Sequence, residues 1–198
     1  MLVADRPYLT PHAYLEWEAR QPDRHEYVAG EVYAMVGVSL RHNAIALNLA
    51  TALRRHLGGR PCQVFFGEVK LRVARANAYY YPDLMVSCGE HRRQADSAVE
   101  VDDPMLVAEI LSPGTEATDR REKLGAYRSL PTLEDYVMVS QDEQRVEIYR
   151  RRGDIGWQVI LLEPGDALDI PSLAFSLPLS ALYEGTDVPA CQPVGPSP

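Results

Sequence analysis

The chain has 198 residues, of which 46% are hydrophobic and 24% are charged, and its formal net charge is −8 at pH 7. This length suits one domain with a full core, and no apolar run approaches the ~18 residues that a membrane span needs. Tight non-specific nucleic-acid binders usually carry a basic stripe. The acidic balance therefore means that nucleic acid is not the ligand, or that basic residues are concentrated locally.

Three cysteines, Cys62, Cys88 and Cys191, lie far apart and form no C-x-x-C pair. An odd number with this spacing argues against a disulfide framework and against a zinc site. We therefore expect free thiols, a packing role for Cys62 and Cys88, and a cytoplasmic location. The start of the chain also lacks the long apolar region of a signal peptide. We expect residues 1–187 to form one domain and the Pro-rich residues 188–198 to be a disordered tail.

The N-terminal third predicts two helices with a hairpin between them. One helix is predicted from Pro11 onward and another over residues 40–57, each preceded by a Thr or Ser that suits the N-cap position. Between them, residues 26–28 and 31–36 are predicted strands joined by a two-residue turn. This pattern gives the chain a helix, a hairpin and a second helix before its first buried strand.

The middle of the chain predicts a group of strands. Residues 63–66, 69–73 and 82–87 have strand character, and we expect them to be antiparallel neighbours. A polar loop over residues 88–103 follows. Residues 105–111 are apolar at all positions but one, which is typical of a strand buried on both faces of a sheet.

A helix and a second buried strand follow. Asp119 with Glu122 three residues later forms a capping-box pattern, which predicts a helix over residues 120–130. Residues 135–139 are again a buried apolar strand. Because a strand, a helix and a strand in succession make a βαβ unit, we expect this strand to run parallel to residues 105–111.

The C-terminal part predicts an outer hairpin over residues 145–150 and 157–161, where polar and apolar residues alternate. This hairpin and the apolar run over residues 170–182 could form a homodimer interface or could close the core. The whole pattern predicts an α/β fold in which a mixed β-sheet is flanked by α-helices.

Two acidic residues in strand-like apolar surroundings are the candidate site. Glu109 interrupts residues 105–111, and Asp83 opens another apolar stretch. A buried carboxylate needs a cation or strong donors to stay ionised. Side chains alternate along a strand, so the two acids can meet at one sheet edge if their strands are neighbours, and there they could bind Mg²⁺ through oxygen ligands. Lys123, one turn into the next helix, could reach the same place, with Tyr127 on its side of the helix.

The order of these motifs resembles the PD-(D/E)XK nuclease superfamily and, more closely, its Uma-type family of restriction endonucleases. The matching segments are His-Glu-Tyr-Val-Ala-Gly-Glu at residues 25–31, Arg41-His42, residues 82–86, residues 109–115, Lys123 and residues 136–139. The resemblance covers about residues 10–185. It implies a restriction-endonuclease-like fold and a DNA phosphodiesterase that uses Mg²⁺ or Mn²⁺.

The resemblance also implies roles for individual residues. Asp83, Glu109 and the carbonyl of Ile110 would hold the metal, Lys123 would assist the attacking water, and Glu26 could bind a second ion or water. His42 is expected to be a packing or capping residue at the entry of its helix. Tyr127 is expected to belong to the core.

The position of the lysine departs from the superfamily pattern. The lysine normally follows two residues after the second acid, but Leu111 occupies that place, so the resemblance implies a migrated lysine at Lys123. A literal Glu-x-Lys stands earlier, at Glu68 and Lys70. We expect Lys70 on the solvated face of its strand, although it could enter the site from a neighbouring strand.

Two other functions remain open. The negative net charge, and the absence of a lysine two residues after the second acid, also fit a nuclease-like fold that no longer cuts DNA. Such a protein would serve as a binding or assembly module. A glycosidase with paired carboxylates is the third candidate, but it would need an open sugar cleft, and few aromatic residues stand near the two acids.

Overall fold

The computed structural model of the protein describes residues 8–35, 37–89 and 100–190. The helices are α1 (Pro11–Glu18), α2 (Leu40–His56), α3 (Glu116–Thr118), α4 (Leu124–Tyr127) and α5 (Leu179–Leu182), with a π-helical turn over Asp119–Lys123. The strands are β1 (His25–Val28), β2 (Glu31–Ala34), β3 (Gln63–Phe66), β4 (Lys70–Val73), β5 (Ala78–Tyr80), β6 (Leu84–Ser87), β7 (Glu100–Val101), β8 (Pro104–Leu111), β9 (Asp135–Ser140), β10 (Val146–Arg151), β11 (Trp157–Leu162), β12 (Ala167–Ile170) and β13 (Phe175–Pro178).

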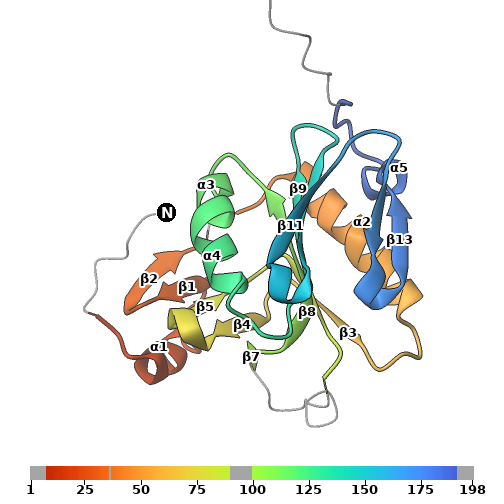
Figure 1. The fold of residues 1–198 in the computed structure, drawn as a ribbon. Coiled ribbons are helices and arrows are strands. Elements are labelled where there is room, and N and C mark those ends of the chain that lie inside the picture. The colour runs from red at the N-terminus through yellow and green to blue at the C-terminus, as the bar shows by residue number, and fades with distance from the viewer. Residues whose placement is uncertain (1–7, 36, 90–99, 191–198) are drawn as a thin grey trace, which may run out of the picture.

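A mixed sheet forms the centre of the fold (Figure 1). Within the described residues it has six strands in the order β11-β10-β9-β8-β6-β3. Strands β8 and β9 are parallel, while β6 is antiparallel to β8 and β10 is antiparallel to β9. The expected βαβ unit, the outer hairpin and the mixed α/β sheet are therefore confirmed.

The two faces of β8 pack against different layers. Leu106, Ala108 and Ile110 face a core that includes α2, α5 and the small β12–β13 sheet. Val107 and Leu111 face the opposite core, which includes α4 and the five-stranded sheet β2-β1-β5-β4-β7. Figure 1 shows α3 and α4 between that second sheet and strand β9. Because side chains alternate along a strand, Glu109 points into this second layer.

The N-terminal elements follow from local sequence. Thr10 and Ser39 accept hydrogen bonds from backbone N–H groups at the starts of α1 and α2, as their N-cap positions predict. Ala29 and Gly30 form the two-residue turn of the β1–β2 hairpin with φ values of 49° and 107°. Two positive φ values in succession match the turn type that favours a tight hairpin.

The expected three-strand group over residues 63–87 is wrong in one respect. Strands β3 and β6 are antiparallel neighbours, but β4 pairs with β5 in the second sheet. Gly67 has φ +71° between β3 and β4, where its N–H donates to the carbonyl of Asp83. The chain leaves one sheet at this glycine and enters the other, and strand character alone does not tell which sheet a strand joins.

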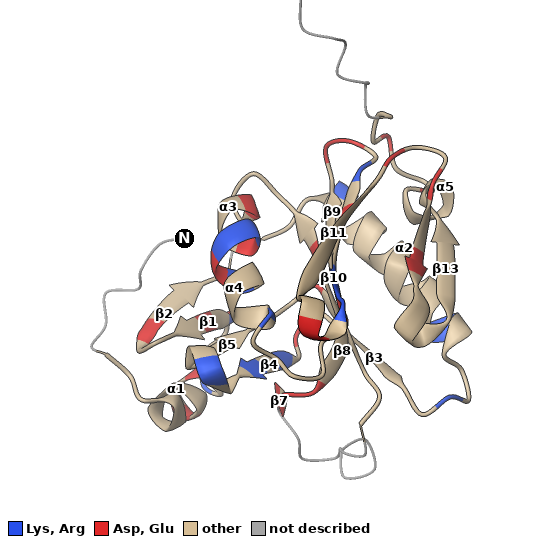
Figure 2. Ribbon diagram, viewed as in Figure 1, with Lys and Arg blue, Asp and Glu red and all other residues tan. Residues whose placement is uncertain are grey.

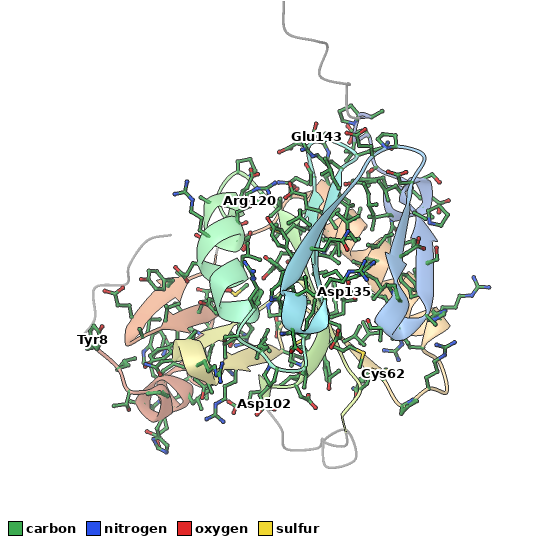
Figure 3. The ribbon with its side chains drawn as sticks, in the orientation of Figure 1. Tyr8, Cys62, Asp102, Arg120, Asp135 and Glu143 are labelled. Carbon is green, nitrogen blue, oxygen red and sulfur yellow. A yellow bond between two sulfur atoms is a disulfide. The ribbon has the colours of Figure 1, made fainter. Side chains whose placement is uncertain are left out.

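The expectation of free thiols is also wrong, because Cys62 and Cys88 form a disulfide. Gln63 pairs with Ser87 in the β3–β6 register, so the two cysteines lie opposite each other just beyond that pair. Figure 3 labels Cys62 at the start of β3. The cysteines are 26 residues apart in sequence, and only the strand register brings them together. The argument for a reducing compartment from three free thiols therefore fails, and Cys191 lies outside the described residues.

The helix after β8 starts earlier than its capping-box pattern predicts. It begins at Glu116, where the N–H of Asp119 donates to the carbonyl of Thr115, after a turn in which the carbonyl of Ser112 accepts from the N–H groups of Thr115 and Glu116. Asp119 is therefore inside the helical segment, in the π-helical turn, and does not cap it. Its carboxylate is buried and faces Lys123, which explains why it is not available to the helix start.

The C-terminal run closes the core. Ile170, Phe175 and Leu182 are buried in the same cluster as α2, so residues 170–182 pack within the chain itself. Residues 188–190, the first part of the expected tail, lie against the fold. Val188 is buried, and Gln144 forms an isolated parallel β-bridge with Ala190. Residues 191–198 lie outside the described part. Among the described helices, none has the length and apolar character required to cross a membrane.

Candidate active site

Glu109 is the centre of a buried hydrogen-bond network in the layer between the two sheets. Its Oε1 accepts hydrogen bonds from Lys123 Nζ at 3.2 Å and from the Tyr127 hydroxyl at 2.9 Å. Its Oε2 accepts a hydrogen bond from the backbone N–H of Asp83 at 3.2 Å. Both carboxylate oxygens therefore have donors, and one donor is a cation.

Asp83 lies immediately before β6 and next to Glu109. Its Oδ2 accepts a hydrogen bond from the backbone N–H of Ile110 at 2.7 Å, and His42 Nε2 lies 2.9 Å from its Oδ1. The two acids are thus tied by reciprocal backbone bonds across the β6–β8 pair, in which Leu84 lies opposite Ala108. The structure brings together the two acids that the sequence singled out.

Lys123 joins Glu109 to two further carboxylates. Its Nζ lies 3.0 Å from Glu26 Oε1 and 3.2 Å from Asp119 Oδ1, and its side chain is only 7% exposed. The Asp119 contact is an ion pair that lacks hydrogen-bond geometry. Glu26 Oε1 also accepts a hydrogen bond from the backbone N–H of Tyr81. The structure therefore places Glu26 and Lys123 at the acid pair.

The charges in this cluster do not balance. Three carboxylates, those of Glu26, Glu109 and Asp119, contact one ammonium, that of Lys123, and the carboxylate of Asp83 lies beside them, 2.9 Å from His42 Nε2. Burial raises the pKa of Glu109 well above its usual range; the Lys123 ammonium opposes this shift and the neighbouring carboxylates add to it. Burial lowers the pKa of Lys123, but the carboxylates around it raise the pKa by more than burial lowers it. The net shift is upward, so the ammonium stays charged. The excess of carboxylates over cations favours either a proton on Glu109 or a second cation beside it.

A cavity of about 240 Å³ opens beside the cluster, and its wall includes Asp83, Glu109, Ile110 and Lys123. Each carboxylate oxygen has two lone pairs, so those of Asp83 and Glu109 can accept a further ligand beside their present donors. Carboxylate and carbonyl oxygens are the ligands that Mg²⁺ and Mn²⁺ prefer. The described residues contain no group of three or more His, Cys, Asp or Glu side chains arranged around a metal position. The residues present fit a cation held by two carboxylates and completed by carbonyl and water oxygens.

Three members of the cluster were not expected from the sequence. The sequence predicts a packing or capping role for His42, yet the residue lies in the first turn of α2 against Asp83, and its buried Nδ1 has no hydrogen-bond partner among the described residues. Asp119 was assigned to a helix cap. Tyr127 was assigned to the core, and it is buried there, but its hydroxyl binds Glu109. The Arg41-His42 pair at the helix entry was the available signal for His42.

Lys70 lies away from these acids. Its ammonium is 5.6 Å from the centre of the Tyr81 ring, and the neighbouring Glu68 pairs with Arg24 at 3.0 Å. Burial lowers the pKa of Lys70. Of the two candidate lysines, Lys123 is therefore the one that contacts Glu109.

This architecture is the restriction-endonuclease-like fold. A crystal structure from Anabaena variabilis, described as "a putative nuclease belonging to DUF820", matches it with a TM-score of 0.72 and 20% identity, over 88% of this chain and 97% of that one. The chain belongs to the Uma2 family, described as "Putative restriction endonuclease", which it matches over residues 11–180. The resemblance inferred from the ordered motifs is confirmed.

Two relatives from Synechocystis sp. extend this finding. The protein slr1290 is 35% identical over 179 residues, which are 90% of this chain and 93% of the relative. The protein sll1609 is 34% identical over 157 residues, which are 79% of this chain and 89% of the relative. Both are described as uncharacterized, so they support the family and leave the reaction to be argued from the site.

Proposed function

We propose that the protein is a Mg²⁺- or Mn²⁺-dependent endonuclease that hydrolyses DNA phosphodiester bonds. One observation carries this proposal: Lys123 Nζ lies 3.2 Å from Glu109 Oε1, although Leu111 occupies the place where the superfamily has its lysine. A lysine from the following helix thus supplies the ammonium that this chemistry requires beside the second acid. A cytoplasmic location belongs to the same proposal and rests on the DNA substrate alone, because the Cys62–Cys88 disulfide gives no support to a reducing compartment.

Asp83, Glu109 and the carbonyl of Ile110 would hold the metal. When bound there, the ion would supply Lewis-acid stabilisation of the phosphate and would lower the pKa of a water ligand. The ammonium of Lys123 can orient the attacking water or stabilise charge on the phosphate oxygens. Glu26 and Asp119 hold that ammonium from its other sides, which keeps it charged and fixed in place.

Glu109→Ala is expected to lower the rate of metal-dependent DNA cleavage by about 10³-fold or more, because it removes both a metal ligand and the partner of Lys123. The measurement is cleavage of plasmid, linear duplex and single-stranded DNA with Mg²⁺ or Mn²⁺. Glu147→Ala is the matched control, since Glu147 pairs with Arg120 outside the cavity. Equal cleavage by wild type and Glu109→Ala would rule the assignment out.

A specific observation supports the alternative of a binding or assembly module. Every oxygen of Asp83 and Glu109 already has a hydrogen-bond partner in the protein, so the fold is satisfied without a metal. Calorimetry with Mn²⁺ separates the two functions. A folded protein that binds no Mn²⁺ at millimolar concentration would favour the module.

His42 is proposed to position Asp83, because its Nε2–H can donate to Oδ1 and fix the carboxylate that would hold the metal. His42→Leu is expected to weaken Mn²⁺ binding by about 10- to 100-fold. His42→Gln keeps an N–H donor and is expected to retain most of the affinity. The two variants are compared by calorimetry, and equal affinities for both would show that the donor does not matter.

A homodimer is the remaining part of the proposal. Two sites in one assembly would cut two strands in a single encounter, whereas one site would have to cut them in turn. Most large side chains of the apolar run over residues 170–182 are buried within the chain, so we do not place the interface on this run. Sedimentation velocity against the chain mass of 22.1 kDa measures the assembly directly.

A further inference from the structure

A second hollow continues from the cavity beside the acids. It has a volume of about 420 Å³, and its wall includes Arg24, Phe66 and Pro82. The two hollows share six lining residues: Met35, Gly37, Val38, His42, Tyr81 and Asp83. One groove therefore runs past Asp83, with the acid cluster at one end and β3 at the other.

The groove exposes apolar side chains beside the proposed catalytic acids. Phe66, at the end of edge strand β3, is 43% exposed, as is Met35, and Val38 is 57% exposed. All three line the hollow next to Asp83. Large apolar side chains that remain exposed together around a polar site mark a surface that binds something apolar.

Among the described residues, the same groove offers almost no free positive charge. Its described lining contains two side chains of Lys or Arg: Lys123, held by three carboxylates, and Arg24, paired with Glu68 at 3.0 Å. Elsewhere, Arg120 is also paired, with Glu116 and Glu147. Figure 2 shows blue and red interspersed over the residues that it colours. Binding along the phosphates of a duplex or of a single strand depends on cations, so a ligand of this groove has to gain affinity from apolar contact as well.

We propose that the groove binds an unpaired nucleobase next to the scissile phosphate, with Phe66 as the stacking surface. The substrate class is then single-stranded or locally unpaired DNA. Stacking on an aromatic ring needs no charge on the protein and tolerates every base. In a duplex the same face of the base is covered by its neighbours. This inference rests on the proposed nuclease function and adds the kind of strand that reaches the acids.

The test measures binding of a labelled single strand and of the duplex of the same sequence by fluorescence anisotropy. The Glu109→Ala background prevents turnover during the measurement. We expect the single strand to bind at least about tenfold more tightly, and Phe66→Ala to lower single-strand affinity by about tenfold or more while duplex affinity stays unchanged. Thermal melting confirms that each variant is folded.

Leu161→Ala is the matched control. Leu161 is 44% exposed on β11, the opposite edge strand of the same sheet, and its loss is expected to leave both affinities unchanged. Tighter or equal binding of the duplex, no effect of Phe66→Ala, or an equal effect of Leu161→Ala would each overturn the inference. Wild-type cleavage keeps the two proposals apart: duplex cleavage independent of Phe66 would leave the nuclease standing, whereas no metal-dependent cleavage of any DNA would remove the nuclease itself.

Discussion

Lys123→Met is expected to abolish DNA cleavage and to lower the free energy of unfolding by about 3–5 kcal/mol. Methionine keeps the length of the side chain but removes its charge. Glu26, Glu109 and Asp119 would then face one another in a buried space without a cation. Removing one partner of a buried ion pair leaves the charge of the other partner buried without compensation. Chemical denaturation measures the stability, and the plasmid assay measures the activity.

Lys70→Met is the matched control for this prediction. Lys70 loses only a contact with the Tyr81 ring, which corresponds to about 0.5–1 kcal/mol at a partly exposed site. We expect this variant to cleave at the wild-type rate. An active Lys123→Met protein together with an inactive Lys70→Met protein would reverse the assignment of the site lysine.

Asp83→Asn is expected to abolish cleavage while changing the stability by only about 1 kcal/mol. The asparagine oxygen can still accept from the Ile110 N–H, and its amide can face His42 Nε2 if the ring changes tautomer. The fold at this point is therefore kept. The negative charge that would hold the metal is lost, so we expect at least tenfold weaker Mn²⁺ binding by calorimetry.

Asp135→Asn should show the opposite pattern. Asp135 is a buried acid outside this cluster, labelled in Figure 3, and its carboxylate lies 2.6 Å from Arg150 Nε. We expect a loss of about 3 kcal/mol in stability with cleavage retained, because this ion pair lies outside the acid cluster. If Asp83→Asn proved active and Asp135→Asn inactive, the cluster around Glu109 would be structural.

Much of the fold could be predicted because its causes are local. Thr10 and Ser39 satisfy backbone donors within three residues, and the Ala29-Gly30 turn sets its hairpin. The alternation along β8 places Glu109 on one face with Val107 and Leu111 without reference to any long-range contact. A carboxylate in an apolar strand requires a partner by energetics alone, so the sequence could mark the acid and predict that it has one.

The partner itself was decided by the tertiary structure. The sequence left Lys70 and Lys123 as alternatives, and the packing of α4 against the second sheet selects Lys123. The Cys62–Cys88 disulfide and the contact of His42 with Asp83 depend on strand register and on the placement of α2. Caps, turns and alternation act over a few residues, whereas register and layer packing join residues 14 to 41 positions apart. The sequence therefore determined which groups need partners, and the fold determined which partners they have.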